Sequence, residues 1–142
     1  MNNMIGKTLG QYEITSLIGR GGMASVYLAR QRSIGRTVAV KVLPHHLLSD
    51  ETFIKRFQRE VQAVSRMQHP RIIPVHDYGE DEGVPYIVMA YIEGGSLLQH
   101  IQDKGALPLD EVVRLIGQIA EGLDYAHQQG VIHRDFKPSN VL

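Results

Sequence analysis

The first ninety residues alternate between short apolar runs and turn residues, a pattern that predicts β-strands. Five runs rich in β-branched or aromatic residues are expected to form strands, at residues 12–18, 25–30, 37–43, 72–78 and 85–91. One helix is predicted over residues 49–67, because Ser49 or Asp50 can cap its start and His69-Pro70 ends it. The first half is therefore mostly β, with a single main helix.

The pattern changes to a helical one after Gly94-Gly95. A short helix is expected at residues 96–102 and a long one at residues 109–128, where apolar residues recur at helical spacing. Gly130 is a suitable residue to end the long helix. The apolar stripe of the long helix is wider than the residues that follow can cover, so we expect exposed hydrophobic surface there.

Composition narrows the class of protein only slightly. The chain has 142 residues, 15 basic and 15 acidic side chains and no cysteine, so neither nucleic acid nor a membrane surface is indicated as a bulk partner. The missing cysteines exclude disulfides and thiolate metal sites. Residues 1–3 are polar and do not resemble a secretory signal, and no apolar run reaches membrane-spanning length. We expect a soluble, cytoplasmic segment.

A glycine-rich string, Gly19-Arg20-Gly21-Gly22 with Ala24 after it, joins the first two predicted strands. A dinucleotide-binding fold requires a helix after the glycines, and here a strand follows. Backbone N–H groups of a strand-glycine-strand hairpin can instead close over phosphates. An ordinary hairpin turn without a ligand remains the alternative.

Lys41 lies on the third predicted strand, where alternation places it on the same face as Ala39. A small residue beside a long cation suits a flat base with phosphates next to it. The alternative is an edge-strand lysine that prevents aggregation.

Glu60 falls within an apolar stripe of the predicted helix. The stripe consists of Phe53, Phe57, Glu60, Val64 and Met67. An unpaired carboxylate there would be unfavourable, so we predict that Lys41 is its partner. Pairing with Arg56 along the same helix is the alternative.

The string His133-Arg134-Asp135-Phe136-Lys137-Pro138-Ser139-Asn140 carries the clearest chemistry. The Asp135 carboxylate can accept a hydroxyl proton, the Lys137 ammonium can offset phosphoryl charge, and the Asn140 amide oxygen can bind Mg²⁺. The string resembles the catalytic loop of protein kinases, and Lys137 two residues after Asp135 is the serine/threonine-type version.

From about residue 12 to 142 the chain is similar to the first half of bacterial serine/threonine protein kinases of the eukaryotic-like type. The motifs stand in family order: residues 19–26, 38–41, Glu60, His69-Pro70, residues 86–91 and residues 133–140. The resemblance implies an α+β protein-kinase fold. It places an N-terminal tail at residues 1–11, an N-lobe with a small antiparallel five-stranded sheet and one main helix at 12–91, and the hinge and start of a helical C-lobe at 92–142.

The resemblance also implies ATP and Mg²⁺ as cofactors and proteins with serine or threonine hydroxyls as substrates. The implied nucleotide-binding residues are Ile18, Gly19, Gly21, Gly22, Val26, Ala39, Lys41, Met89, Ala90, Ile92 and Leu142. Met89 would be the gatekeeper, and the backbone of Ala90 and Ile92 would hydrogen-bond the adenine edge. The implied catalytic residues are Asp135, Lys137, Asn140, Lys41 and Glu60, and Asn140 would also be a metal ligand.

One departure from the family pattern matters for activity: no Asp-Phe-Gly follows Asn140 in this sequence. We therefore expect a kinase N-terminal portion that is inactive by itself. The alternative function is a catalytically dead kinase-like module that binds nucleotide or docks on a partner.

Overall fold

The computed structural model describes residues 4–21 and 24–142. The chain divides into two compact units, of which the first contains residues up to 66 and Pro74–Tyr91, and the second contains Met67–Ile73 and Ile92–Leu142. Residues 67–73 are expected from the sequence in the first lobe, whereas the structure groups this segment with the helical unit.

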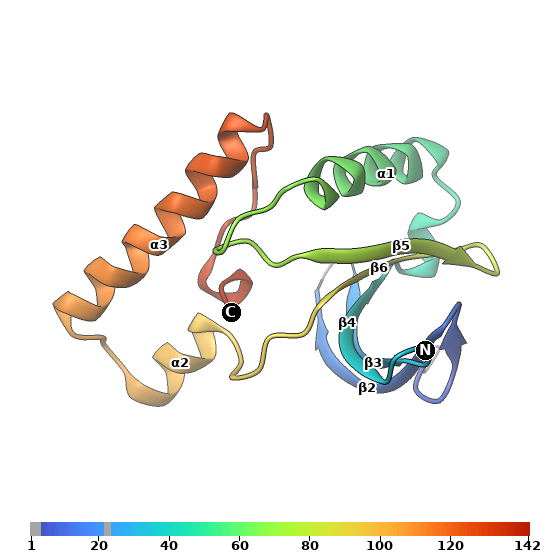
Figure 1. Ribbon diagram of the computed structural model, residues 1–142, viewed down its shortest axis with the longest axis horizontal. Helices are drawn as coiled ribbons and strands as arrows, with labels where there is room; N and C mark the ends of the chain where they lie inside the picture. The colour runs from blue at the N-terminus through green and yellow to red at the C-terminus, as the bar shows by residue number, and fades with distance from the viewer. Residues whose placement is uncertain (1–3, 22–23) are drawn as a thin grey trace. The chain divides into compact units, whose positions relative to one another are not determined.

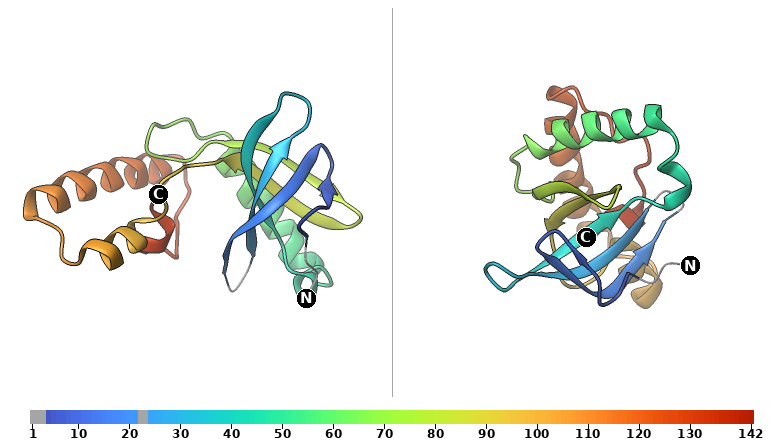
Figure 2. Two further views of the ribbon diagram at one scale, coloured as in Figure 1. Left: turned by 90° about the horizontal axis from the view of Figure 1, so that it is seen from below. Right: turned by 90° about the vertical axis from the view of Figure 1, so that its right-hand side faces the viewer.

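The first unit contains a curled antiparallel sheet, whose strands are labelled in Figure 1 and seen from two further sides in Figure 2. The described strands are β1 (Thr8–Leu9), β2 (Tyr12–Arg20), β3 (Ser25–Gln31), β4 (Arg36–Val42), β5 (Val75–Asp81) and β6 (Val84–Ala90). Their order in the sheet is β1-β2-β3-β4-β6-β5. The described residues thus form six strands rather than the expected five. The additional strand, β1, lies in the predicted tail and is too short for alternation to reveal it.

The hydrophobic core lies on one face of this sheet. Its members are Leu9, Tyr12, Ile14, Tyr27, Ala29, Val38, Val40, Val42, Tyr86 and Val88. Val38, Val40 and Val88 are fully buried, and Ile14 is only 1% exposed. Alternation along β4 places Lys41 on the opposite face from these valines, as the sequence predicted.

Two side-chain hydrogen bonds connect the beginning of the sheet to its last strand. The Tyr12 hydroxyl donates to Asp77 Oδ2 at 2.7 Å, and the Gly10 amide donates to Asp81 Oδ2 at 2.7 Å. Burial raises the pKa of Tyr12 to about 12, and the hydrogen bond to Asp77 adds to the increase. Because these contacts join residues 65 and 71 positions apart, they hold β1 and β2 against β5.

The raised pKa of Tyr12 predicts that the sheet unit loses stability at alkaline pH. Tyr12 ionises near pH 10 when unfolded but near 12 when folded, so its contribution is complete below pH 10 and disappears as the pH rises to 12. We expect a loss of about 2–3 kcal/mol over this range. Urea unfolding at pH 9 and pH 12 measures the loss, and Tyr12→Phe should show a loss smaller by that amount. An equal pH dependence in both proteins would contradict the assignment.

Helix α1 (Glu51–Ser65) covers the face of the sheet opposite to the core and packs along β5, as Figure 1 shows. Asp50 caps its start by accepting hydrogen bonds from the backbone amides of Thr52 and Phe53. A short 3₁₀ turn, η1 (His45–Leu47), precedes this cap. The helix ends at Ser65, slightly earlier than predicted.

The second unit contains α2 (Leu97–Lys104), α3 (Leu109–Gln128) and the 3₁₀ turn η2 (Pro138–Asn140). His100 Nε2 lies 3.0 Å from Glu111 Oε1 and joins α2 to α3. The Leu97 amide donates to the Val141 carbonyl at 2.7 Å, which ties the end of the chain to α2. Gly130 follows α3 with φ +79°, so it ends the helix as the sequence predicted.

Segment 67–73 belongs to this unit because it contacts α3. The Gln68 amide donates to the Tyr125 hydroxyl at 3.1 Å, and the His69 ring lies 5.0 Å from the Tyr125 ring. Gly122 allows this close approach, since a Cβ there would lie 3.2 Å from Arg71 Cβ. Periodicity does not predict this contact, because the segment has no regular structure of its own.

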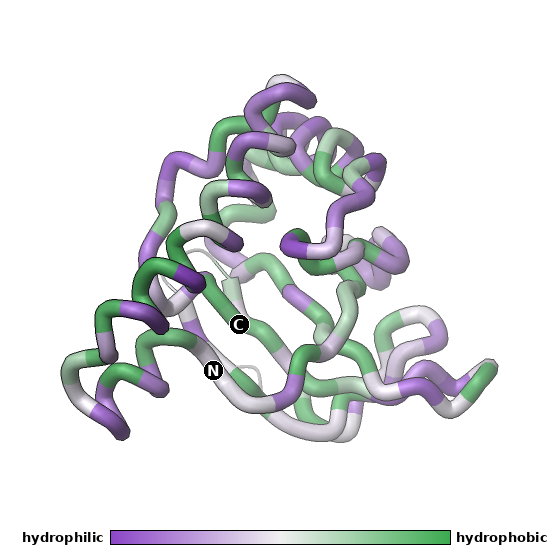
Figure 3. The backbone as a smooth tube through the Cα atoms, turned by 60° about the vertical axis from the view of Figure 1, so that its left-hand side comes forward, coloured by the Kyte–Doolittle hydropathy of each residue, from purple (hydrophilic) through white to green (hydrophobic). Residues whose placement is uncertain are grey.

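One face of α3 exposes apolar side chains, as expected from the width of its stripe. Leu109 is 78% exposed, Val113 64% and Ile116 57%. Figure 3 shows hydrophobic and hydrophilic residues alternating along the helices. Within residues 4–21 and 24–142, no helix combines the length and the hydrophobicity required to cross a membrane.

Candidate functional site

The strand that carries Lys41 lies between β3 and β6, and the cross-strand register brings the expected nucleotide residues together. Lys41 pairs with Val26 on β3 and with Ile87 on β6, and Ala39 pairs with Met89. Residues directly opposite one another point to the same face of a sheet. Val26, Ala39, Lys41 and Met89 therefore share one face. This position in the middle of the sheet excludes the alternative of an edge-strand lysine.

The strands on either side of the glycine-rich string, β2 and β3, pair antiparallel, as expected for a strand-glycine-strand arrangement. Gly19 pairs with Val26, and the Gly21 amide donates to the Ala24 carbonyl at 2.8 Å. Ile18, next to the glycines, is 48% exposed. The predicted contribution of Gly22 lies outside the described residues. A strand after the glycines excludes the dinucleotide-binding arrangement, which needs a helix there.

The structure corrects the predicted orientation of Glu60. Phe57 and Val61 are the α1 residues that turn toward the sheet, and Val61 is only 6% exposed. Glu60 is exposed, because it lies about 100° around the helix from Val61 and on the other side of Phe57. Among the described residues, no ion pair joins Glu60 to Lys41 or to Arg56. The predicted Lys41–Glu60 pair is therefore absent from this conformation.

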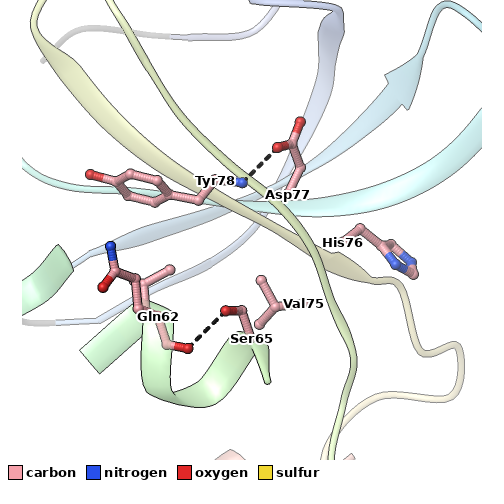
Figure 4. Close-up of a pocket in the computed structure, with 7 residues that line it drawn as sticks. Gln62, Ser65, Val75, His76, Asp77 and Tyr78 are labelled. Carbon is pink, nitrogen blue, oxygen red and sulfur yellow. Dashed lines mark hydrogen bonds between the residues drawn. The ribbon is translucent and has the colours of Figure 1, made fainter. Parts of the chain in front are cut away.

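A pocket of about 280 Å³ lies between α1 and β5, within the first unit. Its lining consists of Val61, Gln62, Ser65, Val75, His76, Asp77 and Tyr78. Figure 4 shows the Tyr78 ring and the Gln62 side chain on one side of it, while the His76 ring points away. Burial lowers the pKa of His76, and the nearby Arg36 guanidinium lowers it further. The lining thus combines apolar and uncharged polar side chains with one carboxylate, that of Asp77.

Tyr78 is a residue of interest that the sequence pattern does not single out. Its hydroxyl is buried and has no hydrogen-bond partner among the described residues. The predicted strand 72–78 begins instead at Val75 and contains an irregularity between Val75 and Asp77. This bulge changes the alternation, so the face on which Tyr78 lies cannot be read from periodicity.

The residues expected to contact the adenine around the hinge belong to both units: Ala90 to the first, and Ile92 and Leu142 to the second. In the first unit, the Ala90 amide donates to the Pro74 carbonyl at 3.0 Å. The Ala90 N–H is therefore occupied, and only its carbonyl could serve an adenine base. In the second unit, Ile92 is 37% exposed and Leu142 is 56% exposed.

The expected catalytic loop is the most completely assembled part of the candidate site. Lys137 Nζ lies 3.3 Å from Asp135 Oδ2, and Asn140 Nδ2 donates to the Asp135 carbonyl at 2.8 Å. The Asp135 amide donates to His133 Nδ1 at 3.3 Å. Arg134, between His133 and Asp135, has a φ of +66°, which is unusual for a residue with a side chain. The Asp135 side chain is 75% exposed and accessible to a substrate hydroxyl.

The donor set fits Mg²⁺ only in part. The Asn140 amide nitrogen is used within the loop, which leaves its oxygen for a cation that prefers oxygen ligands. No group of three or more histidine or acidic side chains is arranged to hold a metal ion in the part of the chain that the structure describes. The loop can therefore supply one metal ligand from Asn140, but the described residues do not form a complete metal site.

Comparison with known proteins agrees with this arrangement. Residues 12–142 match the family model of the protein kinase domain. The chain is 43% identical over 140 residues to serine/threonine-protein kinase PrkC of Bacillus subtilis (strain 168), a match that covers 98% of this chain and 22% of that protein. It is 45% identical to serine/threonine-protein kinase pkn3 of Myxococcus xanthus, covering 97% of this chain and 26% of that protein.

Solved structures give the same result for the fold. A crystal structure of the Mycobacterium tuberculosis PknI kinase domain matches with a TM-score of 0.82 and 39% identity, covering 95% of this chain and 55% of that one. The chain spans about a fifth to a quarter of the length of the curated relatives named above. The match over residues 12–142, the shared fold and the catalytic loop together show that the chain belongs to the protein kinase family, among the bacterial serine/threonine kinases.

Proposed function

We propose that the chain is the ATP-binding and catalytic-loop portion of a protein serine/threonine kinase, which transfers the γ-phosphoryl group of ATP to serine or threonine hydroxyls of proteins. The observation that carries this proposal is the geometry of Asp135, Lys137 and Asn140 on one short loop. An exposed carboxylate, an ammonium 3.3 Å from it and an amide held by the same backbone are among the groups that phosphoryl transfer requires.

In the first unit, the shared face of β3, β4 and β6 would contact the nucleotide. Val26, Ala39 and Met89 offer an apolar surface for the adenine, together with Ile18. Lys41 would bind the α- and β-phosphates, and the glycine hairpin would cover them with backbone N–H groups. The carbonyl of Ala90 would accept a hydrogen bond from the adenine edge, since its amide is already occupied.

In the second unit, the catalytic loop would act on the transferring group. Asp135 would orient the substrate hydroxyl and accept its proton, while Lys137 would offset charge on the phosphoryl group. Mg²⁺, when bound, neutralises the phosphates, and Asn140 would be one of its ligands. Ile92 and Leu142 would complete the contacts to adenine.

The alternative function, a kinase-like module that binds nucleotide without catalysis, differs only in the last step. Lys41, Asp135, Lys137 and Asn140 are all present, and a module without catalysis has no chemical need for the loop geometry described above. Residues 1–142 by themselves contain no carboxylate after Asn140 for the metal ion. We therefore propose that this polypeptide binds ATP but transfers no phosphate.

Titration of ATP with Mg²⁺ into the 142-residue chain tests both statements. Calorimetry should detect binding, and Lys41→Met should weaken ATP about tenfold to a hundredfold without changing adenosine affinity, because a charged hydrogen bond to phosphate is lost. Lys55→Met, which changes an exposed lysine on α1, is the matched control and should bind ATP normally. Equal ATP affinity in all three proteins would reject the site. Phosphate transfer that disappears in Asp135→Asn would reject the inactivity of this polypeptide.

A further inference from the structure

The Tyr78 hydroxyl is the one side-chain polar atom, among the described residues, that is buried without a hydrogen-bond partner. Such groups are rare in folded proteins because burial removes their contacts with water and nothing replaces them. The Tyr78 hydroxyl therefore either lowers the stability of the fold or forms a hydrogen bond in another conformation of the protein.

Tyr78 lies in the same cross-strand row as Lys41. Tyr78 on β5 pairs with Ile87 on β6, and Ile87 pairs with Lys41 on β4. Directly paired residues point to the same face, and two strand spacings separate their Cα atoms by about 10 Å. Both side chains are long and extend from the same face, so they can reach a common point above Ile87.

Helix α1 covers this face and carries Glu60. The Tyr78 ring lies 6.4 Å from the Phe57 ring, one turn of α1 before Glu60. Glu60 is exposed here, and in the described residues neither Glu60 nor Lys41 takes part in an ion pair. The first unit thus carries three groups on neighbouring elements: the Tyr78 hydroxyl on β5, the Lys41 ammonium on β4 and the Glu60 carboxylate on α1.

We propose that Tyr78 is a positioning residue for Lys41, and that its hydroxyl joins Lys41 and Glu60 when nucleotide phosphates are bound. A hydroxyl can donate a hydrogen bond to the Glu60 carboxylate and at the same time accept one from the Lys41 ammonium. A carboxylate can only accept and an ammonium can only donate, so neither of those groups could form such a bridge. The bridge holds the ammonium toward the phosphates. This inference rests on the proposed function of Lys41.

The pocket beside α1 provides the space that this change requires. Glu60 lies about 60° around the helix from Phe57, so a modest rotation of α1 brings it toward the sheet. The pocket of about 280 Å³ leaves unfilled space beside Gln62, Ser65 and Val75, whose positions Figure 4 shows. Close packing against β5 is therefore incomplete at the end of α1 that carries Gln62 and Ser65.

Tyr78→Phe tests the proposal, because it removes only the hydroxyl. Without nucleotide, the urea midpoint of the sheet unit should be equal to or higher than that of the unchanged protein, since a buried group without a partner has been removed. With nucleotide, ATP affinity should fall about fivefold to tenfold, the size expected for the loss of one hydrogen bond of ordinary strength, while adenosine affinity stays constant.

Tyr12→Phe is the matched control on the opposite face of the same sheet. Its hydroxyl has a partner, Asp77, so its removal should lower the urea midpoint and leave the ratio of ATP to adenosine affinity unchanged. If Tyr78→Phe binds ATP normally while Lys41→Met does not, the role of Tyr78 is wrong and the nucleotide site stands. A lower midpoint for Tyr78→Phe without nucleotide also overturns the proposal. Absence of ATP binding in the unchanged protein rejects the nucleotide site and this inference together.

Discussion

Gly79→Ala is expected to lower the free energy of unfolding of the sheet unit by about 3 kcal/mol, the upper part of the range for overpacking a core. A Cβ at Gly79 would lie 2.5 Å from Tyr86 Oη and 2.6 Å from Tyr86 Cζ. Tyr86 is 6% exposed and packs edge-on against Tyr12, with ring centroids 6.1 Å apart, so its ring cannot move aside. The glycine is required by close packing rather than by a turn.

A second glycine provides a control in which the same substitution should raise the free energy of unfolding instead of lowering it. Gly117 lies within α3, and a Cβ there would have no neighbour within 4 Å. Gly117→Ala should therefore stabilise the helical unit by about 0.5–1 kcal/mol through helix propensity. Urea unfolding followed by amide signals of each unit separates the two effects.

The cause of the Gly79 effect can be tested by changing its neighbour. Tyr86→Leu removes the atoms that an alanine at position 79 would meet. The double variant should be less destabilised than the sum of the two single variants, because the clash exists only when both large groups are present. Additive losses would show that the contact with Tyr86 is not the reason for the glycine.

Ile14→Ala is expected to cost about 2–5 kcal/mol, the usual range for truncating a fully buried isoleucine. Ile14 is 1% exposed and lies in the core cluster of the sheet. Its loss leaves a cavity, since the surrounding valines and tyrosines are held in place by the strands.

Ile116→Ala provides the comparison on α3. The same chemical change there should cost less than about 0.5 kcal/mol, because the side chain is 57% exposed and a surface substitution removes little packing. Urea unfolding of both variants, with amide exchange to localise the effect, measures the difference. Similar losses at the two positions would mean that Ile116 is covered in solution, for example by association of the chain.

Several features of the molecule can be predicted from local sequence alone. The catalytic loop is one of them, because its contacts join residues at most five positions apart, such as Asn140 and Asp135. Asp50 is recognisable as a cap because it bonds to amides two and three residues ahead. Alternation along β4 fixes the face of Lys41, since β4 pairs in unbroken register with β3 and β6.

Other features depend on contacts between distant residues. Strand β1 is only two residues long and is stabilised by pairing with β2, which no local pattern reveals. The Tyr12–Asp77 hydrogen bond joins residues 65 positions apart. The apolar stripe of α1 predicts an inward Glu60, but the packing of Phe57 and Val61 toward the sheet turns it outward.

By itself, the sequence determined the protein kinase family, because the motifs of the expected catalytic loop and the glycine-rich string are local patterns that need no distant contacts. Only the tertiary structure decided how α1 is oriented and which face of β5 presents Tyr78. A bulge moves every later side chain of a strand to the other face, and the rotation of a helix depends on which residues its neighbour can accommodate. Both are outcomes of packing between elements, which local patterns do not contain.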